Sequence, residues 1–377
     1  MRNPFVENME QLVKEMTETN QKLLKLTDIL MNLSDIDVGT TPKDLVYEED
    51  KMRLFHYKPM VKTPCPVPML VTYALVNRQY MMDLQSDRSL IRNLLGLGLD
   101  IYIIDWGYPG PGDRYLTLDD YVNGYMNNAV DIVRERSKLD KINLVGVCQG
   151  GTFSVIYAAL YPEKLRNLVV MVAPIDFDTD EGLLHVWARD LPIDNMVDTL
   201  GVIPGDIMNV GFVMLKPFQL MLDKYMGLIE NCDKKEVVEN FVRMEKWIFD
   251  SPGQAGEAIR QFVNDLYKNN LLIKNKLKIG EQPVDLRRIN MPLLNIFAEQ
   301  DHLVPPSASK PLNDAVSSKD KSFFSLRGGH IGIYVSSQSQ TELAPAVAEW
   351  ITLRSQLPKK AVSGRSKKAR SAKNQAT

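Results

Sequence analysis

The stretch 144–151, which reads L-V-G-V-C-Q-G-G, constrains the fold more than any other part of this 377-residue chain. It follows an apolar run at 141–147 that predicts a strand, and it opens onto a helical pattern. Gly146 and Gly150 stand two positions before and after Cys148, where a tight strand-to-helix turn needs small residues. This context favours Cys148 as a nucleophile at a helix N-terminus over the alternative, a buried structural cysteine.

Short apolar strands alternate with helices over most of the chain. We predict strands at 51–57, 67–74, 100–104, 141–147, 168–172, 292–298 and 321–326. The clearest helix is predicted at 118–136, where T-L-D-D at 117–120 forms its cap, and T-P-K-D at 41–44 predicts another helix start. This alternation predicts an α/β fold with a mainly parallel sheet covered on both faces.

The pattern divides the chain into four parts. Residues 1–45 carry an amphipathic helical stripe, and 46–174 with 291–357 form the predicted α/β core. Residues 175–290 are helical, rich in Met and aromatic residues and without convincing strands, which predicts a helical cap inserted into the core. Residues 358–377 hold seven Lys/Arg and no acidic residue, and we expect a disordered basic tail.

Composition excludes several classes of protein. Hydrophobic residues at 45% and charged residues at 24% are typical of a soluble globular protein. No apolar run approaches the roughly 20 residues that a membrane span requires. Three cysteines without a C-x-x-C pair favour a reducing compartment, so we expect a cytoplasmic enzyme.

A thiol nucleophile needs a base and a group that orients the base. The chain has four histidines, and His330 follows the last predicted strand in a glycine-rich loop. Asp301 follows the preceding strand, so the chain order is nucleophile, acid and histidine, as in an α/β-hydrolase triad. Three roles stay open for His302: it shapes the loop, it contacts substrate, or it competes with His330 as the base. His56 and His185 are interpreted as structural.

The remaining site residues are predicted from their position after strands. An oxyanion is expected at the backbone N–H of Gln149 and at that of Val76, with Asn77 as the alternative and as a possible substrate contact. Asp105 ends a strand at the same edge and is interpreted as structural. Cys65 and Cys232 lack a nearby base and are expected to be inert.

Sulfur at the turn points to a particular chemistry. A cysteine accepts an acyl group from a thioester by a nearly isoenergetic exchange, so the acyl group stays activated for transfer to an alcohol. A cap that excludes water favours such transfer over hydrolysis. The residues therefore predict a thioester-using acyltransferase, with a thiol-dependent hydrolase as the alternative.

The combined motifs resemble the class III catalytic subunit of polyhydroxyalkanoate synthases, over residues 38–355. They are G-V-C-Q-G-G at 146–151, Y-A-L-V-N-R at 73–78, D-W-G at 105–107, K-W-I-F-D-S-P at 246–252, A-E-Q-D-H-L-V-P-P at 298–306 and G-G-H-I-G-I-Y-V at 328–335. The resemblance implies an α/β-hydrolase core with a cap, and polymerisation of short-chain (R)-3-hydroxyacyl-CoA with release of CoA. It implies that Cys148 bears the growing chain and that His330 is its base. Asp301 either orients His330 or activates the substrate's 3-hydroxyl.

The resemblance also implies the partners. No metal or prosthetic group is expected, since CoA is part of the substrate, and no nucleic acid is expected. A non-catalytic second subunit, a homodimer or larger assembly, and the surface of a polymer granule in the cytoplasm are expected. The stripe near residues 16–33 and the cap helices are possible contacts. Ala129 stands where some relatives have a second cysteine, so whether one or two Cys148 residues carry the chain stays open.

Overall fold

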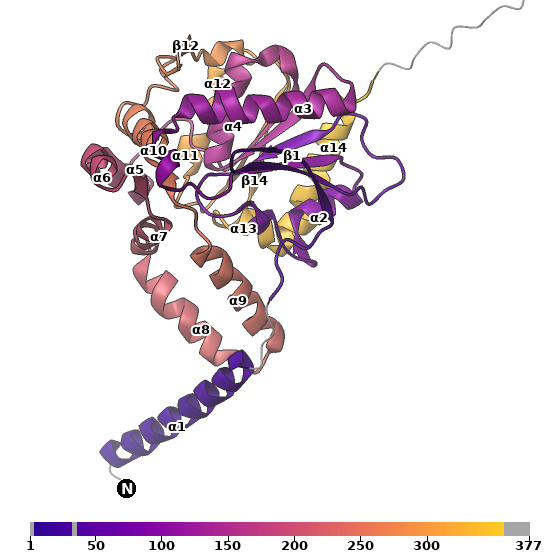
Figure 1. Ribbon diagram of the computed structural model, residues 1–377. Helices are drawn as coiled ribbons and strands as arrows, with labels where there is room; N and C mark the ends of the chain where they lie inside the picture. Colours follow the sequence, from indigo (N-terminus) through magenta and orange to yellow (C-terminus); the bar gives the residue numbers. More distant parts are fainter. Residues whose placement is uncertain (1–3, 32–35, 358–377) are drawn as a thin grey trace, which may run out of the picture.

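The computed structural model of the protein describes residues 4–31 and 36–357. An eight-stranded sheet lies at its centre, in the order β1-β2-β6-β3-β7-β8-β13-β14 (Figure 1). The strands are β1 Lys43–Glu49, β2 Met52–Tyr57, β3 Met69–Thr72, β6 Ile101–Asp105, β7 Ile142–Val147, β8 Leu165–Met171, β13 Leu293–Ala298 and β14 Lys321–Leu326. The pairs from β6 to β14 are parallel, and β1 and β2 run antiparallel at one edge. The predicted fold class is confirmed. The tail predicted at 358–377 lies outside the described residues.

Successive side chains along a buried strand point to opposite sides, so the sheet has two apolar faces. Helices cover both of them. On β7, Leu144 packs into the core beneath α3 (Asn127–Ser137) and α4 (Gln149–Leu160). Its neighbour Val145 packs into the opposite core, with α2 (Leu90–Gly96) and α14 (Ala344–Arg354) (Figure 1). The carboxyl ends of the parallel strands therefore meet at one edge between the two layers of helices.

The helix start predicted at 41–44 is wrong, because this segment leads into the edge strand β1. The Thr41 hydroxyl and N–H both bind the Asp83 carboxylate, at 2.6 and 3.1 Å, instead of capping a helix. Residues Lys43 to Glu49 pair with β2, from Lys43 opposite Tyr57 to Glu49 opposite Met52. Local sequence favoured a helix, but pairing with β2 and the buried Asp83 decide the conformation.

The predicted helix at 118–136 is divided in two. Its first part, η3 (Asp120–Met126), is a π-helix that continues into α3. The predicted cap is present, since the Thr117 N–H and hydroxyl donate to Asp120 at 2.7 Å, and the Asp120 N–H donates back at 3.3 Å. The extra residue in the π turn shifts the helix face that α3 presents to the sheet.

Most of the segment between β8 and β13 is helical. Its elements are α5 Leu183–Asp190, α6 Ile193–Leu200, α7 Gly205–Met214, η5 Phe218–Asp223, α8 Lys224–Glu230, α9 Lys235–Phe249, α10 Gly256–Gln261 and η6 Phe262–Lys268. Contrary to expectation, it also holds two small ribbons, β9 (Val202–Ile203) with β10 (Gln254–Ala255), and β11 (Lys278–Ile279) with β12 (Gln282–Pro283). Elements α7, η5, α8 and α9 form an arm that projects from the body (Figure 1). The exact cap boundaries at 175 and 290 stay a prediction.

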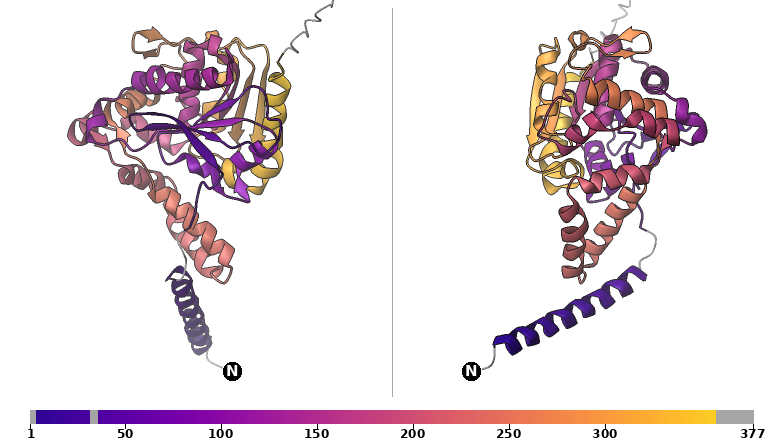
Figure 2. Two further views of the ribbon diagram at one scale, coloured as in Figure 1. Left: turned by 45° about the vertical axis from the view of Figure 1, so that its right-hand side comes forward. Right: turned by 90° about the vertical axis from the view of Figure 1, so that its left-hand side faces the viewer.

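The N-terminal helix α1 (Pro4–Met31) lies outside the body and meets it at the end of the arm (Figure 2). Leu26 is buried there against Leu228, Cys232 and Val238. Most other apolar residues of α1 are exposed, among them Met16, Leu24 and Met31. Within residues 4–31 and 36–357, no helix is both long and apolar enough to cross a bilayer.

Candidate active site

Cys148 stands at the turn between β7 and α4 in a strained conformation. Its φ of 54° and ψ of −127° lie in a region that residues with a Cβ rarely adopt. The Cys148 N–H donates to Met171 O at 2.9 Å, and its carbonyl accepts the N–H groups of Gly151 and Thr152. These bonds tie the turn to β8 and to the first turn of α4, and they leave the thiol half-buried at the sheet's edge.

Two glycines allow this turn, because no side chain fits at either position. A Cβ at Gly146 would overlap Ser154 and the backbone of Gly151. A Cβ at Gly150 would lie against the carbonyl oxygens of Thr72 and Tyr73, closer than Cβ atoms approach oxygen in folded proteins. The elbow is therefore pressed against the end of β3 by close backbone contact.

Asp301 and His330 lie together after β13 and β14. His330 Nδ1 bonds Asp301 Oδ2 at 2.6 Å, and both side chains are almost fully buried. The other oxygen, Asp301 Oδ1, accepts the N–H groups of Leu303 and Val304, each at 2.9 Å. Both carboxylate oxygens are thus occupied, and Asp301 fixes the His330 ring with Nε2 left for the thiol.

The electrostatics of His330 reflect its two partners. Burial alone lowers the pKa of His330, but the Asp301 carboxylate and the Cys148 sulfur, through charge and hydrogen bonding, raise it well above its ordinary value. A raised pKa makes the His330 imidazole a better acceptor for a proton from the Cys148 thiol. His302 is half-buried, and burial with the Lys216 and His330 charges lowers its pKa. The histidine that is hydrogen-bonded to Asp301 is His330, and not His302.

The predicted oxyanion donors come from two segments that are held together. The Gln149 side chain accepts the Leu75 N–H at 3.0 Å, which fixes the segment after β3 against the first residue of α4. Val76 follows directly and packs against the same core as Cys148. The Gln149 N–H lies in the first turn of α4, where helix N–H groups lack intrahelical partners. Gln149 and Val76 are brought to one place, and their role stays a prediction.

Asn77 and Asp105 form structural contacts at the same edge. Asn77 adopts φ 58°, and its amide donates to the Ser251 hydroxyl at 2.5 Å. Asp105 accepts from Arg78 Nη2 at 2.7 Å and from the Gly107 N–H at 3.0 Å. The Asn77 amide therefore links the core to the segment after α9, and its contact with substrate stays a prediction.

The other cysteines and His56 lie apart from this site. Cys65 and Cys232 are buried, and the Cys232 sulfur contacts Lys22 O at 3.5 Å beneath α1. His56 bonds Asp100 at 2.7 Å and stacks on the Tyr102 ring.

Three tyrosines around Cys148 were missed by sequence reasoning. Burial, followed by the charge of Cys148, raises the pKa of both Tyr73 and Tyr267. Tyr334 lies with its ring 6.2 Å from that of His330, and burial with the Tyr73 and Cys148 charges raises its pKa. All three phenols therefore stay protonated. Tyr73 and Tyr334 fall inside motifs noted above, whereas nothing near Tyr267 in the sequence marks it.

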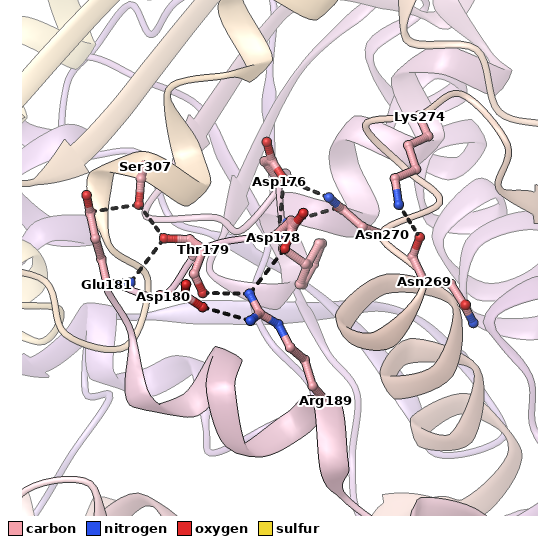
Figure 3. Close-up of polar contacts among 11 residues, drawn as sticks. Asp176, Asp178, Thr179, Asp180, Glu181, Arg189, Asn269, Asn270, Lys274 and Ser307 are labelled. Atoms are coloured by element: carbon pink, nitrogen blue, oxygen red, sulfur yellow. Dashed lines mark hydrogen bonds and ion pairs between the residues drawn. The ribbon is translucent and has the colours of Figure 1, made fainter.

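The segment between β8 and α5 is fastened to the loop that follows Asp301 (Figure 3). The Ser307 hydroxyl donates to Glu181 Oε2 at 2.7 Å and contacts the Thr179 hydroxyl at 2.9 Å. Because the single Ser307 proton goes to Glu181, Thr179 is the donor to Ser307. This contact joins the start of the cap to α11 (Pro306–Ser309) of the core.

Two further residues hold the same segment from the cap side (Figure 3). Arg189 of α5 binds Asp180 at 2.7 Å, Asp178 at 3.2 Å and Thr179 O at 3.0 Å. Asn270 donates to Asp176 Oδ1 at 2.7 Å. The start of the cap is thus held by polar contacts and lies beside the loop that carries the acid. Within the described parts of the chain, no cluster of three His, Cys, Asp or Glu side chains is arranged to hold a metal ion.

The fold and the site define a class of protein. The family model described as alpha/beta hydrolase fold matches residues 75–336, and the chain belongs to that superfamily. A monoacylglycerol lipase from Paleococcus ferrophilus has the same fold, with a TM-score of 0.50 and 18% identity over 79% of this chain and 99% of the lipase.

The chain belongs, more narrowly, to the family of poly(3-hydroxyalkanoate) polymerases, which are acyltransferases. The family model for the N-terminus of poly-beta-hydroxybutyrate polymerase matches residues 3–94. The poly(3-hydroxyalkanoate) polymerase subunit PhaC of Allochromatium vinosum is 51% identical over 92% of this chain and 98% of its own length. The subunit of the same name from Synechocystis is 51% identical over 92% of this chain and 94% of its own length.

Proposed function

We propose that this enzyme polymerises (R)-3-hydroxyacyl-CoA, chiefly 3-hydroxybutyryl-CoA, through a thioester on Cys148. The observation that carries the proposal is the strained Cys148 beside a buried His330 whose Nδ1 is held by Asp301 at 2.6 Å. The names of the relatives supply the polymer class. The thiol, imidazole and carboxylate provide a nucleophile and a proton carrier, so we propose that no metal or prosthetic group is needed.

The first step transfers the acyl group to sulfur. Cys148 gives its proton to His330 Nε2, and its sulfur attacks the thioester carbonyl. The tetrahedral oxyanion is held by the Gln149 and Val76 N–H groups. The carbon–sulfur bond to CoA then breaks, and the leaving CoA sulfur takes the proton from His330 as the Cys148 thioester forms.

The second step lengthens the chain. The 3-hydroxyl of an incoming 3-hydroxyacyl-CoA loses its proton to His330 and attacks the Cys148 thioester carbonyl, forming an oxoester. The Cys148 sulfur leaves and takes the proton from His330, which frees the thiol. Because Asp301 Oδ2 holds His330 Nδ1 and the Asp301 side chain has no exposed surface, we propose that Asp301 orients His330 and does not bind the 3-hydroxyl itself. The lengthened chain, now the CoA thioester of the added unit, then acylates Cys148 again, and CoA leaves with the proton from His330.

Incubation with 3-hydroxybutyryl-CoA tests this function. We expect CoA release to continue while polymer forms and soluble 3-hydroxybutyrate stays low, with an acyl adduct on Cys148 visible by peptide mass spectrometry. Cys148→Ala is expected to abolish CoA release, whereas Cys232→Ala, a buried cysteine under α1, is expected to retain it. One equivalent of free acid per CoA would show a hydrolase instead.

We propose that the enzyme acts in the cytoplasm, on polymer granules and together with a second subunit. The relatives are named as polymerase subunits, which supports a multi-subunit enzyme. The exposed apolar residues of α1 and the arm offer a contact surface. Replacing both Met16 and Leu24 by Ser tests this contact. We expect the variant to fold as wild type does but to lose both granule association and the co-purifying subunit.

A further inference from the structure

His185 of α5 is buried without a hydrogen bond. Its side chain has no exposed surface, and within the described residues neither ring nitrogen has a hydrogen-bond partner. Buried polar groups are nearly always paired, since an unpaired one loses its bonds to water and gains none. An imidazole left in this state is therefore a group that a ligand can satisfy.

The surroundings of His185 are aromatic. Its ring centroid lies 5.3 Å from that of Tyr267 and 6.2 Å from that of Phe177. Tyr267 in turn packs edge-on against Phe177, at 4.8 Å between ring centroids. Apart from the imidazole and the Tyr267 phenol, this wall suits the hydrocarbon part of an acyl chain.

His185 lies between the cap and the catalytic groups. Tyr267, its neighbour, is close enough to Cys148 for the sulfur's charge to act on its hydroxyl. On the other side, an ideal Cβ at Gly182 would lie 2.8 Å from His185 Nδ1 and 3.2 Å from Pro305, in the loop after Asp301. The imidazole therefore lies among residues that border the catalytic groups: Tyr267 on one side and the loop after Asp301 on the other.

The ionisation of His185 defines which ligand it accepts. Burial and the nearby Arg189 charge lower the pKa of His185 to about 4. Their effect is larger than that of the Asp301 and Asp176 charges, which raise it. The ring is therefore neutral at neutral pH and offers one donor and one acceptor. A hydroxyl group has the same pair of properties and matches it, whereas an ammonium or a carboxylate does not.

We propose that His185 binds the hydroxyl group of the 3-hydroxyacyl chain and makes the enzyme prefer hydroxylated thioesters over plain acyl thioesters. The proposal rests on the proposed function and assigns it a specificity-determining residue. Both ring nitrogens are closed to solvent in the structure, so the proposal requires α5 to move before substrate reaches them, with the loss of contacts such as that between Thr179 and Ser307 (Figure 3).

Two thioesters that differ only by the hydroxyl test the proposal. Wild type and His185→Phe are mixed with 3-hydroxybutyryl-CoA or butyryl-CoA, and the burst of CoA release from acylation of Cys148 is measured. We expect His185→Phe to lower the preference for the hydroxylated thioester by about tenfold or more, with the butyryl-CoA rate unchanged. His185→Leu serves as a second variant, and His56→Phe, far from the site, is the matched control.

Thermal unfolding separates this role from packing. Replacing an unpaired imidazole by an apolar ring of similar size is expected to leave Tm unchanged or raise it. An unchanged preference in folded His185→Phe and His185→Leu would overturn the role of His185 alone. If wild type forms no acyl-enzyme with either thioester, the proposed function fails, and the proposal fails with it.

Discussion

Helix α4 and the arm of the cap are built in opposite ways. Each of the twelve residues of α4 is buried, whereas α7, η5 and α8 leave Val210, Phe218 and Met226 largely exposed. The first helix holds the strained Cys148, and strain persists only where surrounding contacts fix it. The second has few contacts to lose when it moves. The tightest packing of the molecule is therefore around the nucleophile, and the loosest is in the arm.

The largest effect is expected from removing the Asp301 carboxylate, which lies in the tightly packed region around the nucleophile. Asp301→Asn is expected to lower CoA release about a thousandfold or more, because His330 loses its orientation and its charged partner. If Asp301 orients His330, the acylation burst slows as well as chain growth. A normal burst followed by arrested growth would instead place Asp301 on the 3-hydroxyl. Asp105→Asn is the control, since Asp105 pairs with Arg78 at the same edge and is expected to cost less than about tenfold.

A methyl group placed in each region should have effects of opposite sign. Gly150→Ala is expected to destabilise the fold by about 3 kcal/mol or more, because backbone oxygens of Thr72 and Tyr73 occupy the site. Gly211→Ala in α7 meets nothing within 4 Å and is expected to stabilise by up to about 1 kcal/mol. Urea unfolding of both variants measures the difference. Equal destabilisation would show that the cap is as tightly packed as the elbow.

The two buried histidines should respond to pH in opposite directions. His185 has a folded pKa lowered to about 4 from 6.5, so its folded state binds fewer protons than the unfolded chain. Its stabilisation is present above pH 6.5 and is lost as pH falls toward 4, by up to about 3 kcal/mol. For His330, whose pKa is raised, stabilisation is full below 6.5 and is lost as pH rises through the folded pKa.

Unfolding curves of wild type, His185→Phe and His330→Gln between pH 5 and 8 check this prediction. The advantage of His185→Phe over wild type should grow as the pH falls. The advantage of wild type over His330→Gln should shrink as the pH rises. When the difference is taken as wild type minus variant in both cases, the two slopes against pH should have opposite signs, and slopes of the same sign would contradict the assignment.

The smallest effect is expected on the exposed side of the arm. Phe218 is 75% exposed, so Phe218→Ser should change the free energy of unfolding by less than about 0.5 kcal/mol. Phe153→Ala, inside α4, is the matched core variant and should cost about 3–5 kcal/mol. A large loss at Phe218 in the isolated chain would mean that the arm has a packing role within one molecule.

Sequence reasoning succeeded where the signal is local. Gly146, Cys148 and Gly150 define the elbow within five residues, and the strands of the core carry their own apolar runs. It failed at 41–44, because the partner of Thr41 is Asp83, 42 residues further along the chain. It also gave no sign of Tyr267, since a tyrosine in a helical segment looks the same whether it faces solvent or a thiol.

The complete burial of α4 has a consequence for how this enzyme can change. With no residue of Gln149–Leu160 facing solvent, nearly every substitution there disturbs the turn that presents Cys148. Variation that adapts the enzyme to longer side chains is therefore expected at partly exposed positions of the cap, and not at fully buried ones such as Phe177. Libraries directed at the partly exposed positions should yield altered substrates with intact folding, whereas libraries directed at α4 should yield mostly inactive protein.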